Sequence, residues 1–315
     1  MYDKKETYKK LMTIVAPIAL QYLMSSLVTA SDAFMLGFLD QDPLSASSLA
    51  GQVAFVFSLF FNAFVFGLNV LAAQYWGKGD EKTANEVLSI SMRFVLIVGF
   101  IFTLATATIP QTIMLIFTDE QPLIEMGADY LRTVSLSYIL TGFTQVYFGM
   151  MKVCDRAKLS SFIGSMAVVV NIVLNALLIF GIWIFPEMGI KGAALATVIA
   201  RIFETICVII AVIMKKCPML NIKLMIHSDN KELLKDYWKY TLPLLINQLG
   251  WGAGVTMYSV IMGHLGTDAT AANSIASIVR SIIASFCWGI AAGVGIIIGN
   301  MLGQNELESA KKAGG

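Results

Sequence analysis

Eight long apolar runs with almost no charge inside them decide what this sequence can fold into. A bilayer core about 30 Å thick needs about 20 apolar helical residues to cross it. Because each run is longer than a membrane strand and apolar on nearly every face, we expect helices. The predicted spans are Leu11–Phe38, Ser47–Tyr75, Val87–Phe117, Gly127–Met150, Leu159–Ile184, Gly189–Met214, Tyr237–His264 and Ala269–Gly303. The predicted fold class is therefore an all-α polytopic membrane protein with about eight transmembrane helices.

The composition excludes several other classes of protein. Only 14% of the residues are charged, against about 25% in an ordinary soluble domain. A net charge of +1 offers no general attraction to phosphate, so nucleic acid is not an expected partner. The four cysteines form no CxxC pair and no metal-ligand spacing. No HExxH, GxSxG or P-loop sequence occurs. We expect a protein that is not an enzyme and that carries no resident cofactor or metal.

Basic residues alternate from loop to loop along the chain. Lys and Arg precede the first span and follow the second, fourth, sixth and eighth, and the intervening loops contain none. The positive-inside rule then places the N-terminus and the even-numbered exits in the cytoplasm. We expect a multi-pass protein of the cell membrane, namely the inner membrane of a bacterium.

An internal repeat divides the sequence. A shift of 226 residues aligns the first two spans with the last two without a gap, and Pro17 then falls on Pro243 and Gly37 on Gly263. The shift spans an even number of helices, so the two copies should be related by an axis along the membrane normal. We predict a six-helix lobe at residues 1–216, a cytoplasmic linker at 217–236 and the first two helices of a second lobe at 237–315. The chain is then expected to be a C-terminally truncated fragment that lacks about four helices.

Small residues and prolines within the spans suggest how the helices pack and bend. Two pairs of glycines spaced by four residues predict close helix packing, and they are Gly289, Gly293, Gly299 and Gly303. Pro17 and Pro243 each remove one backbone hydrogen bond, which predicts bend points in equivalent helices. For Arg280, contact with lipid phosphate, with a further helix or with anionic cargo all stay open.

Four segments carry a resemblance to a known family. They are PIALQYLMSSLVTASDAFMLG (Pro17–Gly37), AAQYWGKGD (Ala72–Asp80), NIVLNALLIFG (Asn171–Gly181) and KGAALATVIAR (Lys191–Arg201). In order and spacing the chain resembles the multidrug-and-toxin-extrusion (MATE) family over its whole length. The resemblance implies a twelve-helix antiporter of two six-helix lobes that exports organic, often cationic, compounds in exchange for Na⁺ or H⁺. Expected partners are the lipid bilayer and small organic substrates, and the expected state is a monomer.

Asp32 is the strongest candidate for a functional residue. It lies about six residues from the outer end of the first span, which is about 9 Å at 1.5 Å per residue. A carboxylate at that depth costs several kcal/mol unless it is protonated or paired, which marks a functional site. The alternative is a carboxyl group near the outer surface on a helix that ends early.

Two asparagines and a threonine are further polar candidates, and Asn175 and Thr197 lie at depths similar to that of Asp32. Asn171 and Asn175 are four residues apart and share one side of the fifth span, and Asn175 and Thr197 are in the outer halves of their spans. One carboxylate with amide and hydroxyl oxygens suits Na⁺ or a shared proton. The asparagines also suit plain hydrogen bonding between helices.

The resemblance implies a cation site in the first lobe at the positions of these four residues. Relatives often have Asp at the position of Asn175, so this chain carries one negative charge fewer and a site with one Asp is expected. Arg201 and Glu204, three residues apart, are interpreted as a structural ion pair.

The working hypothesis is alternating access. Cargo enters between the lobes from the cytoplasm, and a cation that binds Asp32 from outside expels it. The alternative is a lipid-linked oligosaccharide flippase of the same superfamily, which the small number of basic residues within the spans disfavours.

Overall fold

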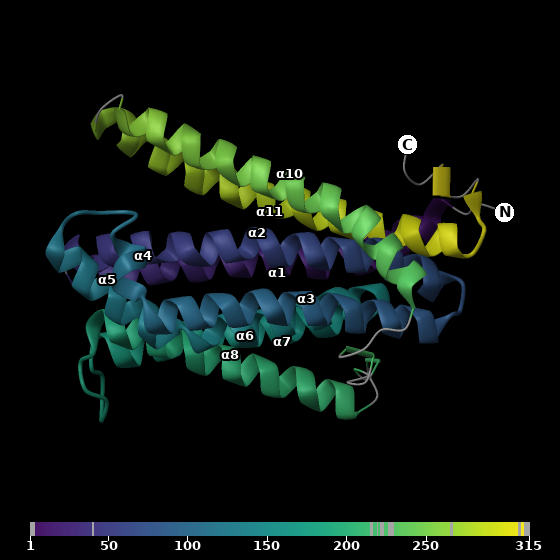
Figure 1. Ribbon diagram of the computed structural model, residues 1–315, viewed down its shortest axis with the longest axis horizontal. Helices are drawn as coiled ribbons and strands as arrows, with labels where there is room; N and C mark the ends of the chain where they lie inside the picture. Colours follow the sequence, from purple (N-terminus) through teal and green to yellow (C-terminus); the bar gives the residue numbers. More distant parts are fainter. Residues whose placement is uncertain are drawn as a thin grey trace.

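The computed structural model describes residues 4–39, 41–214, 217–218, 220, 224–225, 230–264, 267–307 and 310–311, and this part of the chain contains helices and no strand. Long, roughly parallel helices form one bundle, and α10 and α11 cross it at an angle (Figure 1). The helices are α1 (Lys4–Gly37), α2 (Gln41–Gly77), α3 (Glu81–Thr108), α4 (Pro110–Met114), α5 (Gln121–Val134), α6 (Leu136–Val153), α7 (Ala157–Ile179), α8 (Gly189–Ile213), α10 (Lys231–His264) and α11 (Thr267–Gly303).

The predicted class of an all-α polytopic membrane protein is confirmed. Among the described residues, five helices are long and apolar enough to cross a bilayer, and each falls on a predicted span. They are Asp42–Gly77, Glu81–Thr108, Ala157–Ile179, Gly189–Ile213 and Ile283–Gly303. The described apolar part of α1, Val15–Val28, is shorter.

Two predicted spans are interrupted, for local reasons. The third was expected to reach Phe117, but α3 ends at Thr108, because the residue before Pro110 is forced out of the helical region. The fourth breaks at Ser135 into α5 and α6. There the Ser135 carbonyl accepts a hydrogen bond from the hydroxyl of Thr103 at 3.0 Å. Ser135 keeps helical backbone angles (φ −50°, ψ −45°), so this interruption is a local change in hydrogen bonding.

The last two long helices repeat the first two. Helices α1 and α10 both have 34 residues, and α2 and α11 both have 37. The bounds of α11 are those of α2 shifted by the 226 residues that the sequence predicted. Pro17 lies inside α1 and Pro243 inside α10.

Contacts between the two copies also repeat. Helix α11 packs on α1 and α2, and α10 packs on α2. A Cβ added to Gly67 would lie 2.1 Å from Thr241 Oγ1, and one added to Gly293 would lie 2.5 Å from Val15 Cγ2. These two contacts exchange under the 226-residue shift. The copies therefore meet as in a two-fold symmetric dimer, in which each contact occurs twice.

The same exchange holds at the ends of α2 and α11. A Cβ on Gly77 would lie 2.2 Å from the carbonyl oxygen of Asn300, and one on Gly303 would lie 2.0 Å from that of Gln74. Both helices approach closely because neither position carries a side chain.

One contact is its own equivalent and marks the local two-fold axis. A Cβ on Gly299 would lie 2.8 Å from the Cβ of Ala73, and these two positions correspond under the shift. A Cβ on Gly289 would lie 2.6 Å from Ala19 Cα. The four glycines singled out by their spacing, Gly289, Gly293, Gly299 and Gly303, thus face α1 or α2 closely, which confirms the packing that this spacing predicted.

The turn after α2 explains the rest of the AAQYWGKGD segment. Gly79 has a φ of +79°, a left-handed conformation that glycine adopts without a steric penalty. Asp80 then caps α3, because its carboxylate accepts hydrogen bonds from the backbone N–H of Thr83 at 3.0 Å and from its hydroxyl at 2.6 Å. These hydrogen bonds hold the pKa of Asp80 below its ordinary value.

The start of α10 is fastened to α2 and α3. Tyr237 is fully buried, and its hydroxyl donates a hydrogen bond to the carbonyl oxygen of Phe64 at 3.1 Å. Arg93 of α3 donates to the carbonyl oxygens of Leu224, at 2.9 Å, and of Met225. Helix α10 begins at Lys231, before the predicted Tyr237, where the Asn230 side chain accepts from the N–H of Leu233 at 3.1 Å. The predicted linker at 217–236 therefore ends in the first turns of this helix.

We expect Gly299→Leu to destabilise the contact between the two helix pairs. A leucine there must displace α2, and overpacking of this kind costs about 1–3 kcal/mol. The matched control is Gly295→Leu on the same helix, where an added Cβ meets nothing within 4 Å. Thermal unfolding of the detergent-solubilised chain, followed by intrinsic fluorescence, should show a lower midpoint for Gly299→Leu only. Equal midpoints for the two variants would contradict the tight contact.

Candidate cation site

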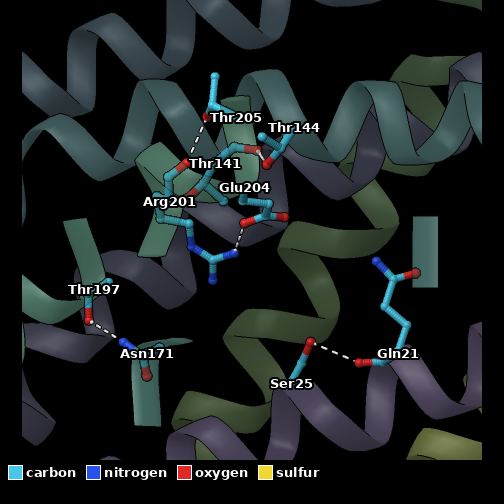
Figure 2. Close-up of polar contacts among 9 residues, drawn as sticks. All are labelled: Gln21, Ser25, Thr141, Thr144, Asn171, Thr197, Arg201, Glu204 and Thr205. Carbon is cyan, nitrogen blue, oxygen red and sulfur yellow. Dashed lines mark hydrogen bonds and ion pairs between the residues drawn. The ribbon is translucent and has the colours of Figure 1, made fainter. Parts of the chain in front are cut away.

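Four of the predicted site residues are brought together by α1, α7 and α8. The amide nitrogen of Asn175 donates to Oδ1 of Asp32 and, at 3.3 Å, to Oδ1 of Asn171. The amide nitrogen of Asn171 lies 3.5 Å from Oγ1 of Thr197 (Figure 2), so this last contact is at the limit of a hydrogen bond. A continuous chain of polar contacts therefore links the three helices, and we call these four residues the Asp32 cluster.

Helical spacing builds the cluster and burial isolates it. Helix α7 packs against both α1 and α8, and the two asparagines stand one turn apart on the face between them. Asn171 is 4% exposed and Asn175 is fully buried, while Asp32 and Thr197 are half-buried. Buried amides of this kind are normally fully paired, because an unpaired polar group in the interior is costly.

An apolar layer covers the cluster toward the predicted outer end. Leu36, Ile179 and Ala193 are buried in one hydrophobic cluster, with Tyr130 packed against it. Each of the three stands one helical turn from a member of the Asp32 cluster, on α1, α7 and α8 respectively. The sequence did not predict this apolar layer, which lies one turn outward from the cluster on all three helices.

An ion pair lies on the side of the Asp32 cluster that faces away from this apolar layer. Arg201 stands one turn beyond Thr197 on α8, and its Nη1 lies 2.5 Å from Oε2 of Glu204 (Figure 2). Glu204 is 1% exposed. The guanidinium charge also acts on the carboxylate of Asp32. The sequence predicted the pair but not its reach toward Asp32, although the four-residue spacing from Thr197 to Arg201 carried that signal.

The oxygens of the Asp32 cluster suit a monovalent cation. Oδ1 of Asn175 is buried without a hydrogen-bond partner, and the Asp32 carboxylate and the Thr197 hydroxyl add further hard oxygen donors. The cluster holds one negative charge, so Na⁺ or a proton balances it, whereas a divalent ion does not. No group of three or more His, Cys, Asp or Glu side chains capable of holding a metal occurs among the described residues.

Arg280 lies away from this cluster, between α10 and α11. Its guanidinium carbon lies 6.0 Å from the centre of the Tyr258 ring, at the wall of a cavity of about 270 Å³ that Trp251 also lines. Neither the contact nor the cavity decides among the roles left open for it.

The MatE family model matches residues 17–177 and 243–315. The chain belongs to the MatE family. The two matched segments begin at Pro17 and Pro243, the pair that the 226-residue repeat brings into register.

Two curated relatives of this MatE chain are named for multidrug resistance or multidrug export. It is 25% identical over 307 residues to the "Probable multidrug resistance protein NorM" of Thermotoga maritima, covering 96% of this chain and 65% of the relative. It is also 25% identical over 278 residues to the "Multidrug export protein MepA" of Staphylococcus aureus, covering 87% of this chain and 60% of the relative. The chain thus spans somewhat less than two thirds of the length of these relatives.

Solved structures show the same fold. The chain superposes with a TM-score of 0.87 on the "Outward-facing conformation of a multidrug resistance MATE family transporter of the MOP superfamily", at 18% identity, covering 97% of this chain and 67% of that one. The TM-score is also 0.87 for the "Crystal structure of MATE in complex with MaD3S", at 20% identity, covering 97% and 68%. At such identities the likeness shows the arrangement of helices and nothing finer.

We expect Asn175→Leu to weaken cation binding more than Asn171→Leu. Asn175 contacts Asp32 directly and contributes the unpartnered oxygen, whereas Asn171 acts through Asn175. The measurement is isothermal titration of the purified chain with NaCl in a choline-based buffer. A loss of about tenfold or more for Asn175→Leu, and a smaller loss for Asn171→Leu, is expected from deletion of a ligand rather than of its support. The reverse order would contradict the geometry.

Proposed function

We propose that this chain belongs to a cation-coupled antiporter that exports organic, cationic or amphiphilic compounds in exchange for Na⁺ or H⁺ by alternating access. The observation that carries the proposal is the Asp32 cluster, in which one carboxylate and several polar oxygens are held among three long helices. The names of these relatives, which refer to multidrug resistance and multidrug export, support this proposal. Because the chain spans only part of their length, the activity and the substrates of the whole protein belong to this proposal.

Charge explains why the cluster couples to movement. An ionised Asp32 in a membrane bundle is costly unless a positive charge accompanies it. A cation drives a conformational change only if it binds one state more tightly than the other. In the proposal, the bound cation draws α1, α7 and α8 together around Asp32. Without the cation this arrangement relaxes, which favours a different orientation of α1 and α2 relative to α10 and α11.

The contact between helix pairs supplies the moving interface. The small-residue contacts of α10 and α11 with α1 and α2 involve the halves of the helices on the side of both chain ends in Figure 1. By the positive-inside rule this side is cytoplasmic. The contacts therefore close the space between the helix pairs on the cytoplasmic side. Reopening it requires the glycine contacts to separate.

The protein works as a monomer in the lipid bilayer of a cell membrane, with its N-terminus in the cytoplasm. It transports small organic substrates and performs no chemistry on them.

We expect Asp32→Asn to abolish gradient-driven transport. The substitution keeps the size of the side chain and removes the charge that the coupling cation balances. The measurement is uptake of a fluorescent organic cation into inverted membrane vesicles that carry the protein, with an imposed Na⁺ or H⁺ gradient.

The matched control is Asp129→Asn. Asp129 forms an exposed ion pair with Lys191 at 3.0 Å, and pairs of this kind contribute little. Uptake by the control should equal that of the wild type. Gradient-driven uptake that persists in Asp32→Asn would contradict coupling through this site, and transport of lipid-linked sugars without any organic cation would favour the flippase.

A further inference from the structure

Arg201 pairs with one carboxylate, Glu204, and stands one helical turn from Thr197, a member of the Asp32 cluster. Its guanidinium contacts Glu204 at 2.5 Å on α8, and its charge also acts on Asp32 of α1. Thr197, one turn away on the same face of α8, belongs to the Asp32 cluster. Tyr130 of α5, a neutral phenol, also interacts electrostatically with Asp32. Arg201 is therefore the positive charge placed to neutralise Asp32 from within the protein.

The contact between Arg201 and Glu204 is built unlike a permanent ion pair. A lasting buried pair commonly uses both carboxylate oxygens against the guanidinium fork. Here one oxygen of Glu204 accepts from Arg201, while the other, Oε1, is buried and has no hydrogen-bond partner. The Arg201 side chain is 34% exposed, whereas that of Glu204 is 1% exposed. The carboxylate is thus held in place while the guanidinium keeps room to move.

The charges of this region do not balance without a further cation. Asp32 and Glu204 together carry two negative charges when ionised, and Arg201 carries one positive charge. One bound Na⁺ or proton at Asp32 makes the set neutral. Without that cation, two carboxylates share a single guanidinium.

We propose that Arg201 is an internal competitor for the coupling cation, moving between Glu204 and Asp32. When the cation leaves, the guanidinium moves toward Asp32 and takes over part of the neutralisation of its charge. When a cation binds, it displaces the guanidinium, which returns to Glu204 as the structure shows it. This inference rests on the proposed function, because it assigns to Arg201 and Glu204 the control of affinity at the same site.

A purely structural ion pair makes a different prediction. If the pair only stabilises α8, removing either charge loosens the fold and changes cation affinity in the same direction for both variants. Under competition the two directions are opposite, and the double variant keeps the tighter binding of Arg201→Gln, whereas the effects of two fixed charges acting through space would largely cancel in the double variant. Arg201→Gln removes the competitor and tightens cation binding, whereas Glu204→Gln frees Arg201 for Asp32 and weakens it.

The test is infrared difference spectroscopy of the full chain in lipid nanodiscs, with Na⁺ as the added cation and H⁺ in a parallel acid titration. The signal is the carboxyl band that Asp32→Asn removes, and the half-saturating concentration is compared between variants. We expect a shift of about tenfold in opposite directions for Arg201→Gln and Glu204→Gln, within the usual range of coupling between sites. The double variant should behave like Arg201→Gln, because Glu204 acts only through Arg201. The matched control, Lys191→Gln, removes another cation from α8 and should match the wild type.

The outcomes separate the two proposals. Shifts in the same direction, or no shift for Glu204→Gln, would overturn the competition while leaving the site intact. If the wild type shows no band that depends on Asp32 with either cation, the proposed function fails first. If Arg201→Gln does not fold, Glu204→Gln still decides the question, because tighter or unchanged binding in that variant contradicts the proposal.

Discussion

A charge buried among helices that face lipid must be compensated, and this requirement explains the polar contacts that α1, α7 and α8 make around Asp32. In water a carboxylate is solvated, but inside a membrane bundle its cost must be met by a proton, a metal ion or a protein cation. Asn175 meets part of the cost with a hydrogen bond, and Arg201 is close enough to meet another part. In the proposed function, the remaining demand for a positive charge is met by a cation that binds and leaves.

The second organising feature is the pseudo-symmetric meeting of two helix pairs. Contacts such as Gly67 with Thr241 and Gly293 with Val15 exchange under the same shift of the chain. Because glycine permits the backbones to touch without interlocking side chains, the interface is close but shallow. Helix α1 takes part in both features, since it carries Asp32 and also receives α11. A change at the cation site therefore has a direct path to the interface between the pairs.

Much of this fold was predictable from the sequence because hydropathy and repetition are long-range signals. The bounds of α2 recur in α11, and the four-residue spacing of Asn171 and Asn175 correctly placed both on one face of α7. What failed was local. The interruption at Ser135 coincides with a hydrogen bond from Thr103 on a different helix, which no pattern along the chain reveals. The apolar layer at Leu36, Ile179 and Ala193 likewise arises only when three helices meet.

The central claim is that Asp32 supplies the one carboxylate of the cation site, so that Na⁺ and H⁺ exclude one another there. The most direct measurement is the number of protons released when NaCl is added to the weakly buffered, purified chain, starting from a pH at which Asp32 is protonated. The account predicts release approaching one proton per chain, and none from Asp32→Asn. Equal release from the wild type and from Asp32→Asn, or Na⁺ binding to the wild type with no release at any pH, would contradict it.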